Sequence, residues 1–203
     1  MSAASSLAAH WEHVYASKAL DQVSWHQQHA DTSLRLITGV TDPTAAVIDV
    51  GAGASPLVDD LLHAGYRDVT TLDVSAQALA AVRARLAGRT GVTYVAADLL
   101  TWQPDRRYDV WHDRAAFHFL SDPADRDRYI TTATRAVAPG GVLVLGTFAA
   151  DGATSCSGLP TARYDADGLA ALFADFTVQL VDHENHHTPG GAKQPFTWVI
   201  LRR

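Results

Sequence analysis

Three things are scarce in this chain of 203 residues: cysteine, excess positive charge and long apolar segments. The single cysteine, Cys156, cannot form a disulfide within the chain. Residues 1–9 are small and polar with no basic flank, so we expect neither a signal peptide nor a membrane span there. Both features are typical of a reducing compartment, and we expect a cytoplasmic protein with no membrane partner.

The charge balance also limits the partners. The chain carries 16 Lys and Arg against 22 Asp and Glu, and the basic residues are scattered. No basic stripe could therefore neutralise a row of phosphates, which argues against nucleic acid as a partner. Apolar residues make up 47% of the chain and no linker or repeat divides it, so we expect one domain over residues 1–203. The composition gives no indication of the oligomeric state.

Short apolar runs rich in β-branched residues predict buried strands, and segments with apolar residues at helical spacing predict helices. The strands are expected at residues 46–50, 69–72, 92–96, 108–111, 142–147, 176–181 and 196–201. The helices are expected at residues 56–64, 76–86, 124–138 and 165–174, the third ended by Pro139-Gly140-Gly141. This order predicts a doubly wound α/β fold with a mostly parallel seven-stranded sheet, an antiparallel C-terminal hairpin strand and helices on both faces.

A glycine turn joins the first predicted strand to its helix, where open α/β sheets bind ligands. It contains Gly51 and Gly53, which allow the backbone to approach a ligand closely, although such a turn alone can also bind nothing. Asp73 closes the second strand, where a carboxylate can accept hydrogen bonds from both ribose hydroxyls. Asp98 follows the third strand and could accept from an adenine amino group. The third glycine typical of a nicotinamide oxidoreductase is absent, so that alternative is weaker but open.

These segments together resemble the class I S-adenosylmethionine-dependent methyltransferases. The resemblance rests on residues 47–55, 71–75, 97–99 and 138–142, which occur in that family's order. It implies that S-adenosylmethionine is the cofactor, with the glycine turn against its methionine portion, Asp73 at the ribose and Asp98 at the adenine. Ser55 stands where many members carry a third glycine, a variant that is similar to lysine methyltransferases of elongation factors.

The resemblance also divides the chain into residues 1–40 as lid helices, 45–147 as cofactor-binding core, and 148–203 as a substrate-side loop, helix and hairpin. Tyr15 and Trp25 lie in the lid segment and could cover the sulfonium with their rings, or could pack on the sheet instead. Four further residues are expected at the cofactor: Asp49, Val74, Leu99 and Arg114.

Catalytic candidates lie after the fourth strand. Methyl transfer is an in-line displacement, so the enzyme aligns two reactants and, for a hydroxyl or ammonium acceptor, removes a proton. His118 is the first candidate base, although it could be a buried structural histidine. Asp113 is the alternative base or a positioning group. Arg114 could instead pair with Asp113 or Asp122.

A polar connection is predicted over residues 182–195, and it contains His183, His186 and His187. These could line the substrate cleft or bind a metal; no fixed ligand pattern is present, so we expect no metal. Cys156 is interpreted as a packed side chain, because nothing in the sequence would lower its pKa.

Four functions follow from these patterns. The first is methyl transfer to oxygen, nitrogen or sulfur of a small molecule. The second is methylation of protein lysine, which an acidic surface could support. A nicotinamide oxidoreductase and a cofactor-binding subunit without catalysis are the others.

Overall fold

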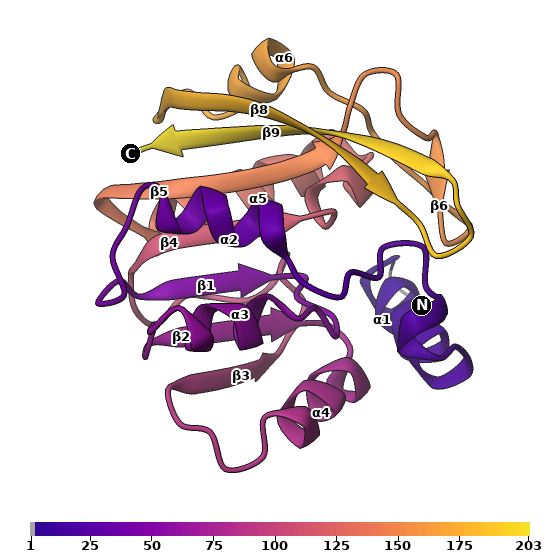
Figure 1. The fold of residues 1–203 in the computed structure, drawn as a ribbon. Helices are drawn as coiled ribbons and strands as arrows, with labels where there is room; N and C mark the ends of the chain where they lie inside the picture. Colours follow the sequence, from indigo (N-terminus) through magenta and orange to yellow (C-terminus); the bar gives the residue numbers. More distant parts are fainter. Residues whose placement is uncertain (1–2) are drawn as a thin grey trace.

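Seven strands form one sheet in the order β3-β2-β1-β4-β5-β9-β8 (Figure 1). The computed structural model describes residues 3–203. The strands are β1 (Val47–Val50), β2 (Val69–Asp73), β3 (Val92–Ala96), β4 (Tyr108–Arg114), β5 (Val137–Phe148), β8 (Thr177–His187) and β9 (Lys193–Arg202). Strands β1 to β5 pair in parallel, and β9 runs antiparallel to both β5 and β8. The predicted fold class is confirmed.

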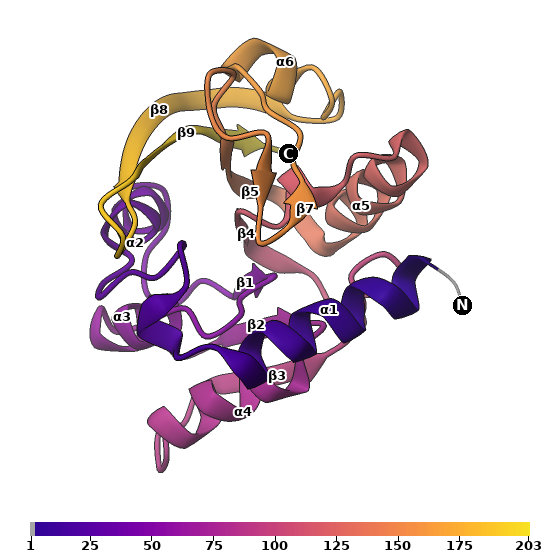
Figure 2. The ribbon, with the colours of Figure 1, turned by 90° about the vertical axis from the view of Figure 1, so that its right-hand side faces the viewer.

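The central strands are apolar because helices cover both faces of the sheet. One face packs against α2 (Asp31–Thr38), α3 (Leu57–His63) and part of α4 (Ala76–Arg85), with Leu61 and Trp198 in its core. The other packs against α5 (Pro123–Ala136) and α6 (Ala166–Ala170), with Trp111 and Tyr129 in its core. Figure 2 shows α2 and α3 on one side of the sheet and α5 on the other. Helix α2 therefore belongs to a face of the sheet and not to a lid.

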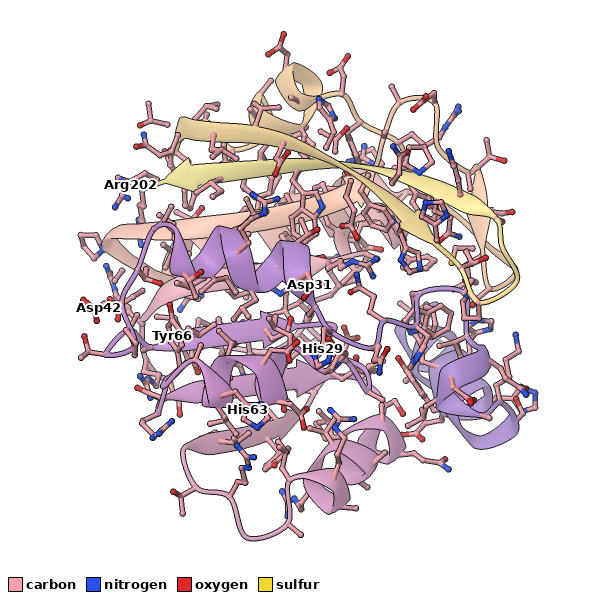
Figure 3. The ribbon with its side chains drawn as sticks, viewed as in Figure 1. His29, Asp31, Asp42, His63, Tyr66 and Arg202 are labelled. Carbon is pink, nitrogen blue, oxygen red and sulfur yellow. The ribbon has the colours of Figure 1, made fainter. Side chains whose placement is uncertain are left out.

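Helix α1 (Ala3–Ser17) crosses the carboxyl ends of β1, β2 and β3 (Figure 2). The Glu12 carboxylate fixes it there by accepting a hydrogen bond from the Ala76 backbone N–H, at 2.6 Å, at the start of α4. Asp42 and Arg202 lie at the opposite end of the sheet (Figure 3). The carboxyl ends are thus covered by the N-terminal helix. The 3-10 turn η1 (Leu20–Gln22) follows α1 in the chain, and a second one, η2 (Phe117–Phe119), contacts α1 through the rings of Phe119 and Trp11.

Several boundaries differ from the predicted ones. Strand β5 begins at Val137, so Pro139-Gly140-Gly141 lie inside an irregular first part of this strand and α5 ends at Ala136. Strands β8 and β9 extend through most of the predicted connection, leaving residues 188–192 as the turn. The part of β8 beyond the predicted strand, residues 182–187, is polar, so an apolar pattern underestimates the length of this edge strand. Helix α6 is shorter than predicted, and a two-stranded ribbon of β6 (Ser155–Cys156) and β7 (Leu159–Pro160) occupies the predicted substrate-side loop.

Within residues 3–203, no helix combines the length and apolarity that crossing a membrane requires.

Candidate functional site

A cavity lies at the carboxyl ends of the strands, beneath α1. Its walls are mostly apolar and aromatic, and they include Trp11, Tyr15 and Trp25 from the N-terminal segment. The aromatic rings of the walls pack edge-on against one another. The centroid distances are 5.6 Å between Trp11 and Trp25, 5.1 Å between Trp11 and Phe119, and 6.2 Å between Tyr15 and Trp25. This aromatic cluster closes the cavity on the side of α1, and the covering of a sulfonium by Tyr15 and Trp25 stays a prediction.

The glycine turn after β1 is held against two neighbours. Gly51 and Gly53 have φ of +62° and +53°, a region that other residues adopt only with strain. A Cβ atom at Gly51 would lie 2.5 Å from the Ala116 Cβ, and one at Gly53 would lie 2.1 Å from the Tyr15 hydroxyl. The turn can therefore pack against Ala116 and Tyr15 only because both positions lack side chains. Gly51 lines both cavities of the site, whereas Gly53 lies outside them.

Asp73 ends β2 and lines the cavity. Its Oδ2 accepts from the Gly53 N–H at 2.7 Å, and its Oδ1 accepts from the Ser75 N–H at 2.8 Å. Burial raises the pKa of this carboxyl to about 6, although both backbone hydrogen bonds oppose the shift. Each oxygen can still accept a further hydrogen bond, so the carboxylate can hold two hydroxyls while it fixes the glycine turn.

Three more predicted cofactor residues line the same cavity: Val74, Asp98 and Leu99. Asp98 follows β3, and its Oδ1 accepts from the Leu100 N–H at 2.9 Å in a tight local turn. This bond aims the carboxylate while leaving its other oxygen free of protein partners within the described residues. The arrangement suits recognition of an amino group.

Asp49 lies in a second, smaller cavity next to the first. Its Oδ1 bonds to His112 Nδ1 at 2.7 Å, and His112 Nε2 bonds to the Ser33 hydroxyl at 2.9 Å. All three side chains are buried, and the His112 ring stacks on Trp198. The sequence analysis gave no role to Ser33 or His112, because β1, β4 and α2 come together only in the folded chain. The relay fixes the Asp49 carboxylate.

Arg114 ends β4 and lines both cavities. Its side chain is 10% exposed, yet its Nε and one terminal nitrogen have no hydrogen-bond partner among the described residues. The nearest carboxylate is Glu184 at 3.7 Å, and the guanidinium lies 4.6 Å above the Phe196 ring. Pairing with Asp113 or Asp122 does not occur. Burial lowers the pKa of Arg114. A ligand with a hydrogen-bond acceptor would satisfy the unpaired N–H groups of this buried side chain.

Asp113 is fully buried and does not line either cavity. Its carboxylate accepts from the Ala116 and Phe117 N–H groups and from the Tyr129 hydroxyl, the last at 2.7 Å. Burial raises its pKa to about 6. The residue thus shapes the turn that carries Ala115, whose φ is +71°, and presents His118.

His118 lines the first cavity. Its Nδ1 accepts from the Phe148 N–H at 3.3 Å, and its buried Nε2 has no partner within the part of the chain that the structure describes. Burial, helped by the charge of Arg114, lowers the pKa of this imidazole to about 3. His118 and Asp113 are therefore brought to one turn, but they do not contact each other through their side chains.

The three histidines of β8 separate onto its two sides. His186 is buried, and its Nε2 donates to the Ser24 carbonyl at 2.8 Å, whereas His183 and His187 are exposed. Over residues 3–203, no group of three or more His, Cys, Asp or Glu side chains is arranged to hold a metal ion. Cys156 lines the cavity, and burial raises the pKa of its thiol.

Comparison with known proteins agrees with this arrangement. Residues 47–141 match a family model described as "Methyltransferase domain". No curated protein matches the chain. Among solved structures, a SAM-dependent methyltransferase from Anabaena variabilis ATCC 29413 is 14% identical, with a TM-score of 0.78 and coverage of 100% of this chain and 96% of that one.

Two further solved structures contain a cofactor product. The N-methyltransferase NodS from Bradyrhizobium japonicum WM9, in complex with S-adenosylhomocysteine, is 14% identical, with a TM-score of 0.74 and coverage of 96% of this chain and 98% of that one. The 1,6-didemethyltoxoflavin-N1-methyltransferase from Burkholderia thailandensis, with 1,6-didemethyltoxoflavin and S-adenosylhomocysteine bound, is 19% identical, with a TM-score of 0.71 and coverage of 100% and 91%.

Residues 47–141 therefore carry a methyltransferase domain, and the whole chain has the fold of the S-adenosylmethionine-dependent methyltransferases. These matches support an enzyme that uses S-adenosylmethionine, as the resemblance implied, over a nicotinamide oxidoreductase.

Proposed function

We propose that this enzyme methylates a small molecule bound beneath α1. The supporting observation is the cavity itself, which lies beside the predicted cofactor residues and is closed by the rings of Trp11, Trp25 and Phe119. Such an enclosed, mostly apolar cavity with a few polar groups is typical of small-molecule sites. The cofactor supplies an electrophilic methyl group on a sulfonium.

Residues on the strand ends hold the cofactor in this proposal. Asp73 accepts from the ribose hydroxyls, Asp98 accepts from the adenine amino group, and Val74 and Leu99 pack beside the adenine. Asp49 and Arg114 line the same small cavity with opposite charges, which suits the ammonium and carboxylate of the methionine portion.

Around the methyl group, the remaining roles are steric and orienting. Gly51 and Gly53 leave space for the methionine chain, and Tyr15 and Trp25 cover the sulfonium. Of the two roles predicted for Asp113, we favour the positioning group, because its carboxylate is occupied by the η2 turn and lies outside the cavity.

Protein lysine is the less suitable acceptor. Its ammonium would enter a cavity lined by the Arg114 guanidinium, and like charges in a desolvated site repel strongly. Labelling a cell lysate with a radioactive methyl donor distinguishes a small-molecule acceptor from a protein acceptor. Label in small molecules supports the proposal, and a labelled protein band would contradict it.

Cofactor binding is tested by titration calorimetry with S-adenosylhomocysteine. We expect binding by the wild type and a loss of about 100-fold in affinity for Asp73→Ala, since two charge-assisted hydrogen bonds disappear. Asp105→Ala removes an exposed carboxylate and is the matched control, expected to bind normally. Unchanged affinity of Asp73→Ala would remove this residue from the cofactor site.

A further inference from the structure

We propose that the acceptor enters this site already deprotonated, as a thiolate, and that His118 holds its sulfur by donating a hydrogen bond from Nε2. The inference rests on the proposed function and names its substrate class. The role of His118 is then the reverse of the predicted general base.

The position of the imidazole proton follows from one hydrogen bond. His118 Nδ1 accepts from the Phe148 N–H, so Nδ1 carries no proton. A neutral imidazole has one N–H, which must therefore be on Nε2, and a protonated ring nitrogen can only donate. Nε2 is buried and unpartnered among the described residues, in a residue that lines the cavity. A ligand with a hydrogen-bond acceptor would satisfy this N–H group.

The surroundings keep this ring neutral. The rings of Phe119 and Phe148 lie 4.5 and 4.4 Å from His118 between centroids, and Arg114 adds a positive charge nearby. These neighbours lower the pKa of His118 to about 3, so it does not accept a second proton near neutral pH. Glu184, which partly offsets the charge of Arg114, accepts from Gln27 and Trp198 and does not line the cavity.

Other groups around the cavity do not offer a base either. The titratable and charged side chains that line it with His118 are Tyr15, Asp73, Asp98, Arg114, Tyr129 and Cys156. Asp73 and Asp98 are bonded to backbone N–H groups on the cofactor strands, and the proposed function engages their remaining lone pairs with the ribose and the adenine. The Tyr129 hydroxyl donates to Asp113 and accepts from Trp111. Burial raises the pKa values of Tyr15 and Cys156, which keeps both protonated.

A site with donors and no base selects an acceptor that ionises by itself. Thiols ionise at a pKa of about 8.5, against about 10 for phenols and alkylammonium groups, and thiolates are strong nucleophiles. Sulfur also packs favourably against aromatic rings such as Phe119 and Phe148. The thiol gives its proton to water before binding. Its sulfur lone pair then forms the bond to the methyl carbon, while the carbon–sulfonium bond breaks and leaves its electron pair on the cofactor's sulfur.

The first test reads the histidine directly. Nitrogen-15 NMR of the protein saturated with S-adenosylhomocysteine should show His118 as the neutral tautomer protonated on Nε2, unchanged from pH 5 to pH 9. The His118→Phe variant assigns the signal. An imidazolium at neutral pH, or a proton on Nδ1, would overturn the inference.

The second test uses thiophenol and phenol as a matched pair of probes on the protein saturated with S-adenosylhomocysteine. Thiophenol should bind at least 10-fold more tightly than phenol at pH 7.5, and His118→Phe should lose about 10-fold of the thiophenol affinity, the range expected for one hydrogen bond to a charged group. His118→Gln retains an N–H donor and should restore binding. His183→Phe, on the exposed side of β8, is the control.

Activity gives a third reading. With S-adenosylmethionine, the pH midpoint for methylation should follow the pKa of the thiol when thiophenol is replaced by its more acidic 4-nitro derivative. Failure of thiophenol to bind, or equal binding of phenol, while S-adenosylhomocysteine still binds would overturn the thiolate assignment. Loss of S-adenosylhomocysteine binding itself would instead refute the proposed function.

Discussion

The two sides of the site satisfy their polar groups in different ways. On the cofactor side, formed by the ends of β1, β2 and β3, each carboxylate is bonded to a backbone or buried side-chain partner, as Asp73 is to Gly53 and Asp49 to His112. On the acceptor side, formed by η2 and β5, His118 retains an unpaired nitrogen among the described residues, and so does Arg114 at the end of β4, between the two sides. The cofactor side is thus organised before a ligand arrives, whereas the acceptor side needs a ligand to satisfy its donors.

The largest expected effect concerns the buried carboxyl of Asp113, at the end of β4, and its contribution to the free energy of unfolding. Burial raises the pKa of Asp113 from an ordinary 3.8 to about 6 in the folded protein. The folded state therefore keeps a proton that the unfolded chain loses, and its stability falls as the pH rises from about 4 through 6. This residue alone should account for about 3 kcal/mol of that loss.

Asp113→Asn cannot ionise, so its free energy of unfolding should gain about 3 kcal/mol relative to wild type between pH 4 and pH 7. Urea unfolding at a series of pH values measures the difference. Asp73 has a similarly raised pKa and remains in the variant, so part of the wild-type slope should persist. Parallel curves for the two proteins would mean that Asp113 is not the buried charge.

The same contrast explains what could be predicted from the sequence. The fold could be predicted, because strands covered on both faces are continuous apolar runs. The places of Asp73 and Asp98 in the cavity could also be predicted, because each lies at the carboxyl end of its strand. The Asp49–His112–Ser33 relay could not, since its members are 63 and 79 residues apart along the chain. Nor could the proton position of His118, which depends on one N–H of β5.

A smaller effect is expected from filling the cofactor side. Gly53→Ala would force a side chain into a left-handed φ of +53° and place its Cβ 2.1 Å from the Tyr15 hydroxyl. We expect about 10-fold weaker binding of S-adenosylhomocysteine, from strain and displacement of α1. Calorimetry measures it.

The double variant Gly53→Ala with Tyr15→Phe separates the two causes. It removes the hydroxyl oxygen, the atom nearest to the added Cβ, and should recover part of the affinity. Gly190→Ala is the control, because the atom nearest to its added Cβ would be the Thr188 hydroxyl oxygen at 3.8 Å, an ordinary contact. If the double variant recovers no affinity, backbone strain accounts for the whole loss of affinity.

The smallest effect concerns the helix that joins the two sides. Glu12 holds α1 to the start of α4 through one hydrogen bond to the Ala76 N–H, and such a contact at a helix N-terminus contributes about 0.5–1 kcal/mol. Glu12→Ala should therefore release S-adenosylhomocysteine about 2- to 5-fold faster, because α1 opens more often. Stopped-flow tryptophan fluorescence can follow this through Trp11 and Trp25, and Glu12→Gln, which keeps an acceptor oxygen, should stay close to wild type. Equal release rates for all three proteins would show that the aromatic cluster alone holds α1 over the cavity, through its contact with Phe119 on the acceptor side.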